Sequence, residues 1–276
     1  MRASVVAAFG LFLAPGSQSW DYVEPMKKVA ARFAGKDGVV LHVGDSMTYS
    51  NNYSRWARKG LGKTERDKAI CAWTHAGADD DTDGWWLSLV DRPGYRSETA
   101  AGGLRIDQCL AGGKGGLPPL ATLLEKYKPR MVIVMLGNYD ALDDRKAADY
   151  KSDMRKAIDL ILAAGAVPIL STLMPSPDRE ALLKTYNAAL LELGRDKGLP
   201  MIDLWGEILK RRPNDWHGTL VDKPGRHLTA SQGGATSTSE PTEENLRNSG
   251  YLLRGWLSVQ KIAEVKERVL DPLQKK

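Results

Sequence analysis

Cysteine, histidine and long apolar runs are scarce in this sequence. The chain of 276 residues contains two cysteines, Cys71 and Cys109, and four histidines. Two cysteines are too few for a disulfide scaffold, and neither has metal-ligand neighbours at a familiar spacing, so we predict no metal site. No segment is long and apolar enough to span a membrane. No basic run indicates nucleic-acid binding, although the formal net charge is +5.

The first residues carry an export pattern. Met1 and Arg2 form a short positive end, residues 5–14 are mostly apolar, and small residues follow up to Ser19. This order is typical of a signal peptide. We therefore predict a signal peptide over residues 1–19, export to the periplasm or the medium, and a single domain over residues 20–276. The alternative is a buried first helix.

The second half of the chain alternates regularly between two kinds of pattern. Short runs rich in apolar and β-branched residues predict buried strands, at residues 38–43, 131–136, 167–172 and 200–203. Amphipathic stretches that end near a glycine predict helices, at residues 22–34, 147–164 and 179–197, with a further helix to about residue 211. Strands that alternate with helices predict a parallel sheet with helices on both faces.

Two regions lack this regularity. Residues 60–116 are rich in Gly, Asp and Trp, and we predict long loops there, with a fifth strand near residues 96–98. Long loops in a compact domain often bear a binding surface. Residues 233–242 form a polar linker, and a final helix is predicted over residues 243–270, weakened by Gly250 and Gly255.

Three polar groups are candidates for chemistry. Ser46 directly follows the first strand, where its hydroxyl is exposed and a backbone N–H can stabilise an oxyanion; the alternative is a helix N-cap. Asn138 follows a central strand, where its amide is a donor for an oxyanion or caps a turn. His227 lies in a late Pro/Gly loop near Asp222, either as an oriented base or as a surface histidine.

In this order the motifs resemble those of the SGNH (GDSL-like) hydrolase family, and some stretches are similar to planctomycete members. Gly44-Asp45-Ser46, Gly137-Asn138-Tyr139-Asp140 and the late His227 carry the resemblance. It implies an α/β fold, namely a flavodoxin-like three-layer α/β/α sandwich with a parallel five-stranded sheet. It also implies ester hydrolysis without a cofactor, with Ser46 as nucleophile, His227 as base and Gly103 as the oxyanion glycine.

The sequence departs from the family pattern at two positions. Tyr139 occupies the usual Asn position, and Asn138 stands one residue early. We expect Tyr139 to face the cleft, although a rebuilt turn would present Asn138 instead. The family's Asp three residues before the histidine is Pro224 here, which leaves Asp222 as the nearest carboxylate to orient His227.

The predicted substrate is a small-molecule or glycan ester, most specifically an acetylated carbohydrate. Export and a Trp-bearing loop region are the basis for this choice. We place Asp45, His75 and Trp85 at the substrate. Two alternatives use the same fold: a catalytically weakened glycan-binding protein, and an O-acetyltransferase.

Overall fold

A parallel sheet of four strands forms the centre of the molecule. The computed structural model describes residues 20–92, 94 and 96–274, so the predicted signal peptide lies outside the described residues. The strands are β1 (Val40–Gly44), β2 (Met131–Met135), β3 (Val167–Ser171) and β4 (Met201–Ile202), in the order β1-β2-β3-β4. All four are fully buried, which explains their continuous apolar sequences.

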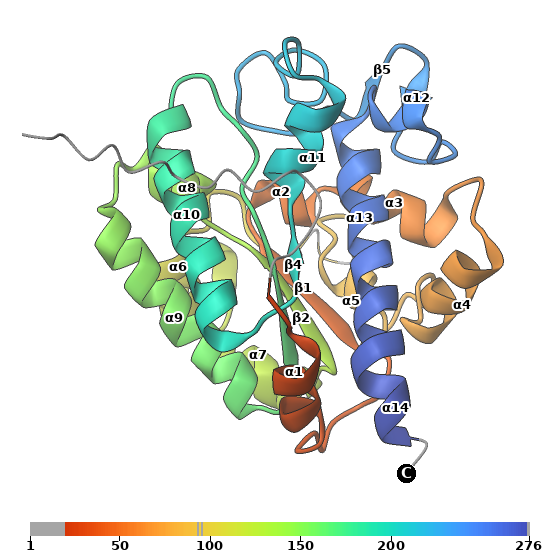
Figure 1. The fold of residues 1–276 in the computed structure, drawn as a ribbon, viewed down its shortest axis with the longest axis vertical. Coiled ribbons are helices and arrows are strands. Elements are labelled where there is room, and N and C mark those ends of the chain that lie inside the picture. Colours follow the sequence, from red (N-terminus) through yellow and green to blue (C-terminus); the bar gives the residue numbers. More distant parts are fainter. Residues whose placement is uncertain (1–19, 93, 95, 275–276) are drawn as a thin grey trace, which may run out of the picture.

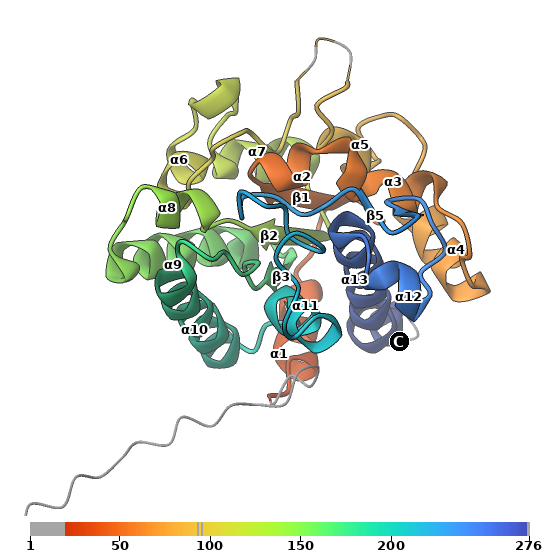
Figure 2. The same cartoon turned by 90° about the horizontal axis from the view of Figure 1, so that it is seen from above.

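Helices cover both faces of this sheet. Figure 2 shows α1 (Val23–Ala30) and α13 (Gly250–Val265) on one side, and α5 (Gly84–Leu87) and α7 (Leu120–Tyr127) on the other. The long helices are α9 (Ala147–Ala163) and α10 (Glu180–Lys197), and α11 (Leu204–Arg211) follows β4. These bounds agree closely with the helices predicted from the periodicity. The α/β class and the layered arrangement are confirmed.

The predicted fifth strand is not formed. Near residues 96–98 the chain makes only one parallel bridge to the sheet, between Ala100 and Gly44. The Ser97 hydroxyl accepts from the backbone N–H groups of Thr99 and Ala100, and the Thr99 hydroxyl donates to the His42 carbonyl at 2.7 Å. Side chains therefore make the hydrogen bonds that a strand would have made with its backbone.

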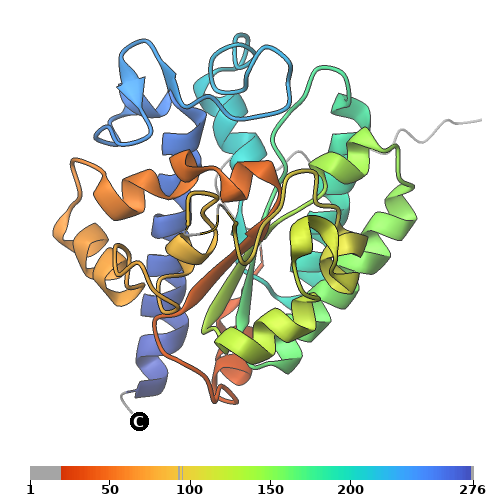
Figure 3. The same ribbon diagram turned by 180° about the vertical axis from the view of Figure 1, so that it is seen from behind.

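The segment between β1 and β2 is a series of short helices joined by loops. Seen from behind, it runs in orange and yellow across one side of the sheet (Figure 3). Its elements are α2 (Ser46–Tyr49), α3 (Asn51–Lys59), α4 (Glu65–Trp73), α5, α6 (Ile106–Ala111), a 3-10 turn (Lys114–Gly116) and α7. Cys71 and Cys109 in this segment are both buried and unbridged.

The C-terminal segment is not the single helix predicted. It consists of α12 (Glu243–Leu246), α13, a π-helical turn (Lys266–Leu270) and α14 (Asp271–Gln274). The break comes before Ser249, whose hydroxyl accepts from the Leu252 N–H and caps α13. In the predicted linker, β5 (Ser231–Gln232) and β6 (Ala235–Thr236) form a small hairpin.

Gly250 and Gly255 allow close packing rather than only weakening this helix. A side chain at Gly250 would collide with the Leu220 carbonyl, and one at Gly255 would come within 2.8 Å of the Tyr53 carbonyl. Helix α13 therefore packs directly against both the loop after α11 and helix α3. No helix in the described part of the chain is long and apolar enough to span a bilayer.

Candidate active site

The carboxyl ends of the strands gather the polar groups that follow each strand. Helices α2, α8 (Asn138–Leu142) and α11 begin at this end, which is uppermost in Figure 1. The loop between α11 and β5 crosses the same end. Ligands of open parallel sheets bind at this edge, so the candidate site lies where the sequence predicts it.

Ser46 lies in a tight turn, here called the serine turn (residues 44–49). It is the first residue of α2, and Asp45 caps this helix by accepting the Met47 N–H at 3.0 Å. The first N–H groups of a helix have no partner within it. Asp45 accepts the N–H groups of Met47, Thr48 and Tyr49, which leaves the Ser46 N–H as the donor beside the Ser46 hydroxyl, although the residue is only 8% exposed.

His227 lies in the histidine loop (residues 215–229), which its own hydrogen bonds hold in shape. The Asp222 N–H donates to the His227 carbonyl at 2.8 Å. The Asp222 carboxylate accepts from the backbone N–H groups of Arg226 and His227, at 2.8 and 3.1 Å. Asp222 thus closes the turn that carries the histidine, a role that the sequence alone did not suggest.

The structure brings Ser46, His227 and Asp222 together. Ser46 Oγ lies 3.0 Å from His227 Nε2, although 181 residues separate them. Asp222 Oδ2 lies 3.5 Å from His227 Nδ1, and the histidine side chain is 40% exposed. A hydroxyl bonded to an imidazole whose other nitrogen faces a carboxylate can be deprotonated as it attacks an acyl carbon.

Gly103, Asn138 and Tyr139 lie at the same end of the sheet as Ser46, since Ala100 bridges Gly44 and α8 begins just after β2. Gly103 has φ +71°, a conformation that favours glycine, and a methyl group placed on it would lie 3.4 Å from the Tyr139 ring. Asn138 begins α8 and is 8% exposed. Its Nδ2 is buried and has no hydrogen-bond partner among the described residues. Of the two side chains, Asn138 therefore has the buried donor, which lies near the Asp45 carboxyl and lowers its pKa, and Tyr139 packs beside Gly103.

Comparisons with known proteins agree with this geometry. The sequence profile of the GDSL-like lipase/acylhydrolase family matches residues 42–232, which is more than half of the chain. The chain belongs to this family. Its resemblance to the GDSL-like hydrolases, predicted from the order of the motifs, is confirmed. No curated protein sequence matches it.

Solved structures of similar fold include two hydrolases. One is a lipase/acylhydrolase from Enterococcus faecalis, with TM-score 0.51, 18% identity, and 83% of this chain and 96% of that chain covered. The other is a carbohydrate esterase family 3 protein from Talaromyces cellulolyticus, with TM-score 0.53, 15% identity, and 83% and 98% covered. At these identities the likeness is one of fold.

Three residues predicted at the substrate lie elsewhere in this GDSL-like chain. Asp45 is fully buried beneath the serine turn. Trp85 is also fully buried, with its ring 3.9 Å from the His42 ring centroid. His75 is exposed but lies beside Gly38, before β1 and hence at the opposite end of that strand from Ser46. None of the three is therefore placed to contact substrate, because Asp45 and Trp85 are buried and α4 leads away from Ser46.

Burial changes the electrostatics of Asp45. Loss of water raises the pKa of this carboxyl to about 6, against the opposing effects of the Met47 N–H, Arg254, Asn138 and His227. Its Oδ2 has no hydrogen-bond partner among the described residues. Asp45 is therefore an N-cap and a charge beneath the site rather than a group that contacts substrate.

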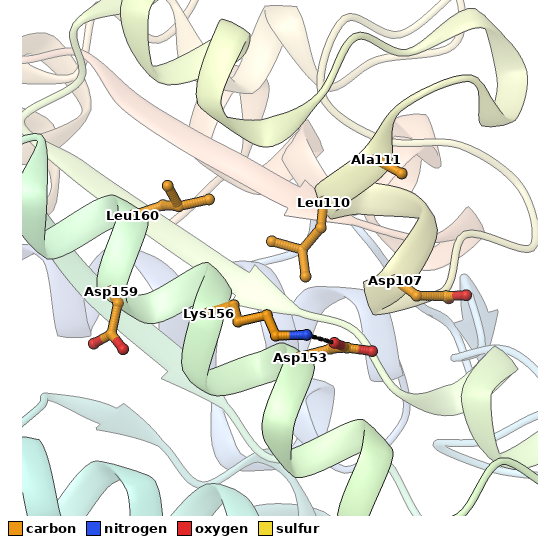
Figure 4. Close-up of a pocket in the computed structure, with 7 residues that line it drawn as sticks. All are labelled: Asp107, Leu110, Ala111, Asp153, Lys156, Asp159 and Leu160. Carbon is orange, nitrogen blue, oxygen red and sulfur yellow. Dashed lines mark hydrogen bonds and ion pairs between the residues drawn. The ribbon is translucent and has the colours of Figure 1, made fainter.

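Other hollows and clusters on the protein do not compete with this site. Figure 4 shows a shallow hollow between α6 and α9, lined by Asp107, Leu110, Ala111, Asp153, Lys156, Asp159 and Leu160. Its lining contains no nucleophile paired with a base. Across the described ranges, no group of three His, Cys, Asp or Glu side chains could hold a metal ion. In the acidic run before α5, Asp79 and Asp83 form ion pairs with Arg58.

The sequence analysis missed Arg254, which contacts the serine turn from α13. Its guanidinium donates to the Met47 carbonyl and to the Thr48 hydroxyl, both at 2.9 Å. The sequence did contain a signal for this residue, namely a single arginine among the apolar residues Tyr251, Leu252, Leu253 and Leu257. A charged residue on an apolar helix face needs a buried partner.

Proposed function

We propose that this protein is a serine esterase that removes a short acyl group, an acetyl group on a carbohydrate, outside the cytoplasm. Ser46 is the nucleophile, His227 the general base, and Asp222 the group that orients the histidine. The observation that carries the proposal is the 3.0 Å separation of Ser46 Oγ and His227 Nε2. No cofactor takes part in the reaction.

The steps follow from the placement of these groups. Ser46 Oγ attacks the ester carbonyl carbon and passes its proton to His227 Nε2. The N–H groups of Ser46 and Gly103 and the amide of Asn138 stabilise the oxyanion. The protonated histidine then gives its proton to the departing alcohol. A water molecule, deprotonated by the same nitrogen, hydrolyses the acyl-serine and returns Ser46 to its starting state.

The positions of Tyr49 and Tyr139 support a substrate with a short acyl group on a sugar. A methyl group on Gly102 would lie 3.2 Å from the Tyr49 ring, and one on Gly103 would lie 3.4 Å from the Tyr139 ring. The rings therefore stand close beside the oxyanion glycine. Both tyrosines are partly exposed, and aromatic faces of this kind stack on sugar rings. We assign contact with the sugar to these two tyrosines and not to Trp85, which is buried in the core.

A fluorophosphonate probe and p-nitrophenyl esters test the proposal. We expect the probe to label Ser46 and acetate to be hydrolysed faster than octanoate. Ser46→Ala should lower kcat/KM by at least about 10⁴-fold. It should change the free energy of unfolding by less than about 1 kcal/mol. Ser152→Ala, on the exposed face of α9, is the matched control and should change neither property.

Each alternative function predicts a different result. A glycan-binding protein on this fold would bind sugar but leave Ser46 unlabelled and the esters intact. An O-acetyltransferase would be labelled at Ser46 and would release the acyl group only when an acceptor alcohol is present. Either result would contradict esterase function.

A further inference from the structure

Arg254 is a charged side chain in the protein interior. It lies on α13, is only 2% exposed, and stacks over the Tyr53 ring at 3.8 Å from its centroid. Burying a guanidinium costs free energy that hydrogen bonds must offset, and an apolar side chain of similar volume often stabilises a core at least as well. The retained charge therefore calls for an explanation beyond packing.

Both hydrogen bonds of this guanidinium go to the serine turn. One nitrogen donates to the Met47 carbonyl and the other to the Thr48 hydroxyl, each at 2.9 Å. These acceptors belong to the two residues that follow Ser46. A planar guanidinium that bonds two successive residues restrains their backbone more strongly than packing alone.

The helix that carries Arg254 also supports the histidine loop. The Gly250 and Tyr251 N–H groups donate to the hydroxyl and the carbonyl of Thr229, at 3.3 and 3.1 Å. The Ser249 hydroxyl donates to the Ala230 carbonyl at 3.0 Å. One helix therefore holds the segment of His227 at its first turn and the segment of Ser46 one turn later.

We propose that Arg254 is a positioning residue that holds the serine turn against α13 and thereby sets the distance from Ser46 to His227. The inference rests on the proposed function, because it assigns Arg254 to the alignment of that pair. Arg254 does not touch substrate, since its side chain is buried behind the turn. Its loss should therefore lower kcat and leave KM nearly unchanged.

The first test compares Arg254→Met with Arg130→Met. Arg130 is also buried, stacks on Phe33 at 4.3 Å and donates to the Ala30 carbonyl, but it precedes β2 at the opposite end of the sheet. With both variants folded by circular dichroism, Arg254→Met should lower kcat about 10–100-fold and change KM less than about threefold. Arg130→Met should retain wild-type kcat. Arg254→Lys, which keeps the charge and one donor, should recover part of the loss.

A second test does not require Arg254 to be removed. Thr48→Val keeps the shape of the side chain and deletes one acceptor, and it should lower kcat severalfold. Thr74→Val removes a buried hydroxyl bonded to the Cys71 carbonyl, away from the site, and should leave kcat unchanged. In the Arg254→Met background the effect of Thr48→Val on kcat should disappear, because the two residues act through one hydrogen bond.

The rate of fluorophosphonate labelling separates the two proposals. If wild-type Ser46 is not labelled, the proposed function fails, and the positioning role with it. If Ser46 is labelled at the same rate in Arg254→Met as in wild type, only the positioning role is overturned. Equal losses of kcat in Arg254→Met and Arg130→Met, or equal effects of Thr48→Val and Thr74→Val, would also overturn it.

Discussion

The serine turn and the histidine loop meet at one hydrogen bond but are built differently. Asp45, Thr48 and Arg254 are buried, and the bonds that hold the serine turn come from its own helix and from α13. The histidine loop is partly exposed, and Asp222 closes it by bonding its own backbone. Changes to the buried supports of Ser46 should therefore affect stability and catalysis together, whereas changes to the exposed side chains of the loop should affect catalysis alone.

After Ser46→Ala, the largest effect expected is that of His227→Ala. Loss of a general base typically costs about 10²–10⁴-fold in rate. Because the His227 side chain is 40% exposed, its removal should leave the melting temperature nearly unchanged. His217→Ala is the control: His217 lies in the same loop, is exposed and bonds only the Lys223 carbonyl. Equal losses of activity in the two variants would mean that the loop, rather than His227, matters.

The next effect concerns Asn138 and Tyr139. Removal of one oxyanion donor costs about 10²–10³-fold in kcat. Since Asn138 Nδ2 is the buried donor of the two side chains, Asn138→Ala should cause that loss. Tyr139→Asn should change kcat/KM on a small acetyl ester less than about threefold. The reverse pattern would assign the third donor to Tyr139, the choice expected from the sequence.

The pH dependence of stability tests the role of buried Asp45 in the serine turn. Its folded-state pKa, about 6, exceeds the ordinary value of 3.8, so between these two values the folded chain binds a proton that the unfolded chain lacks. Stability from this group is therefore greatest at low pH and is lost as pH rises through 6. The unfolding free energy of wild type minus that of Asp45→Asn should fall by on the order of 2 kcal/mol between pH 4 and pH 7. A difference that does not vary with pH would contradict the shift.

A smaller loss of rate than those of His227→Ala and Asn138→Ala is expected for Asp222→Asn. The amide can still accept the Arg226 and His227 N–H groups, so the loop keeps its shape. The charge that stabilises the imidazolium is lost, but the carboxylate is partly exposed and 3.5 Å from the ring. Solvent weakens such an interaction, and we expect about a tenfold drop in kcat. Asp222→Ala, which also removes the loop closure, should be worse; equal effects would contradict the second role of Asp222.

The sequence predicted the sheet and the meeting of Ser46 with His227, because both follow from patterns along the chain. Continuous apolar strands and glycine-ended helices gave the parallel sheet. Ser46 and His227 could be identified from the order of the motifs along the chain. That Asp222 faces the histidine depended on the turn through Pro224 and Gly225, whose path no spacing rule specifies.

The errors share one physical cause, which is tertiary placement. A tryptophan in a loop-rich segment has no periodicity to say which way it faces, and Trp85 faces the core because α5 packs on β1. His75 was assigned to the site by its loop, but that loop follows α4 to the other end of the sheet. The predicted fifth strand does not form, because the Ser97 hydroxyl accepts the Thr99 N–H and the Thr99 hydroxyl donates to the His42 carbonyl.

Helix α13 has a consequence for the synthesis of the chain. It follows both Ser46 and His227, and its first turn and Arg254 hold the two segments in place. A ribosome-bound chain that ends before Gly250 contains Ser46, Asp222 and His227 yet lacks the helix that holds the segments of Ser46 and His227. Since chains begin to fold while they are being translated, the order of the segments delays the pairing of Ser46 with His227 until α13 has been translated.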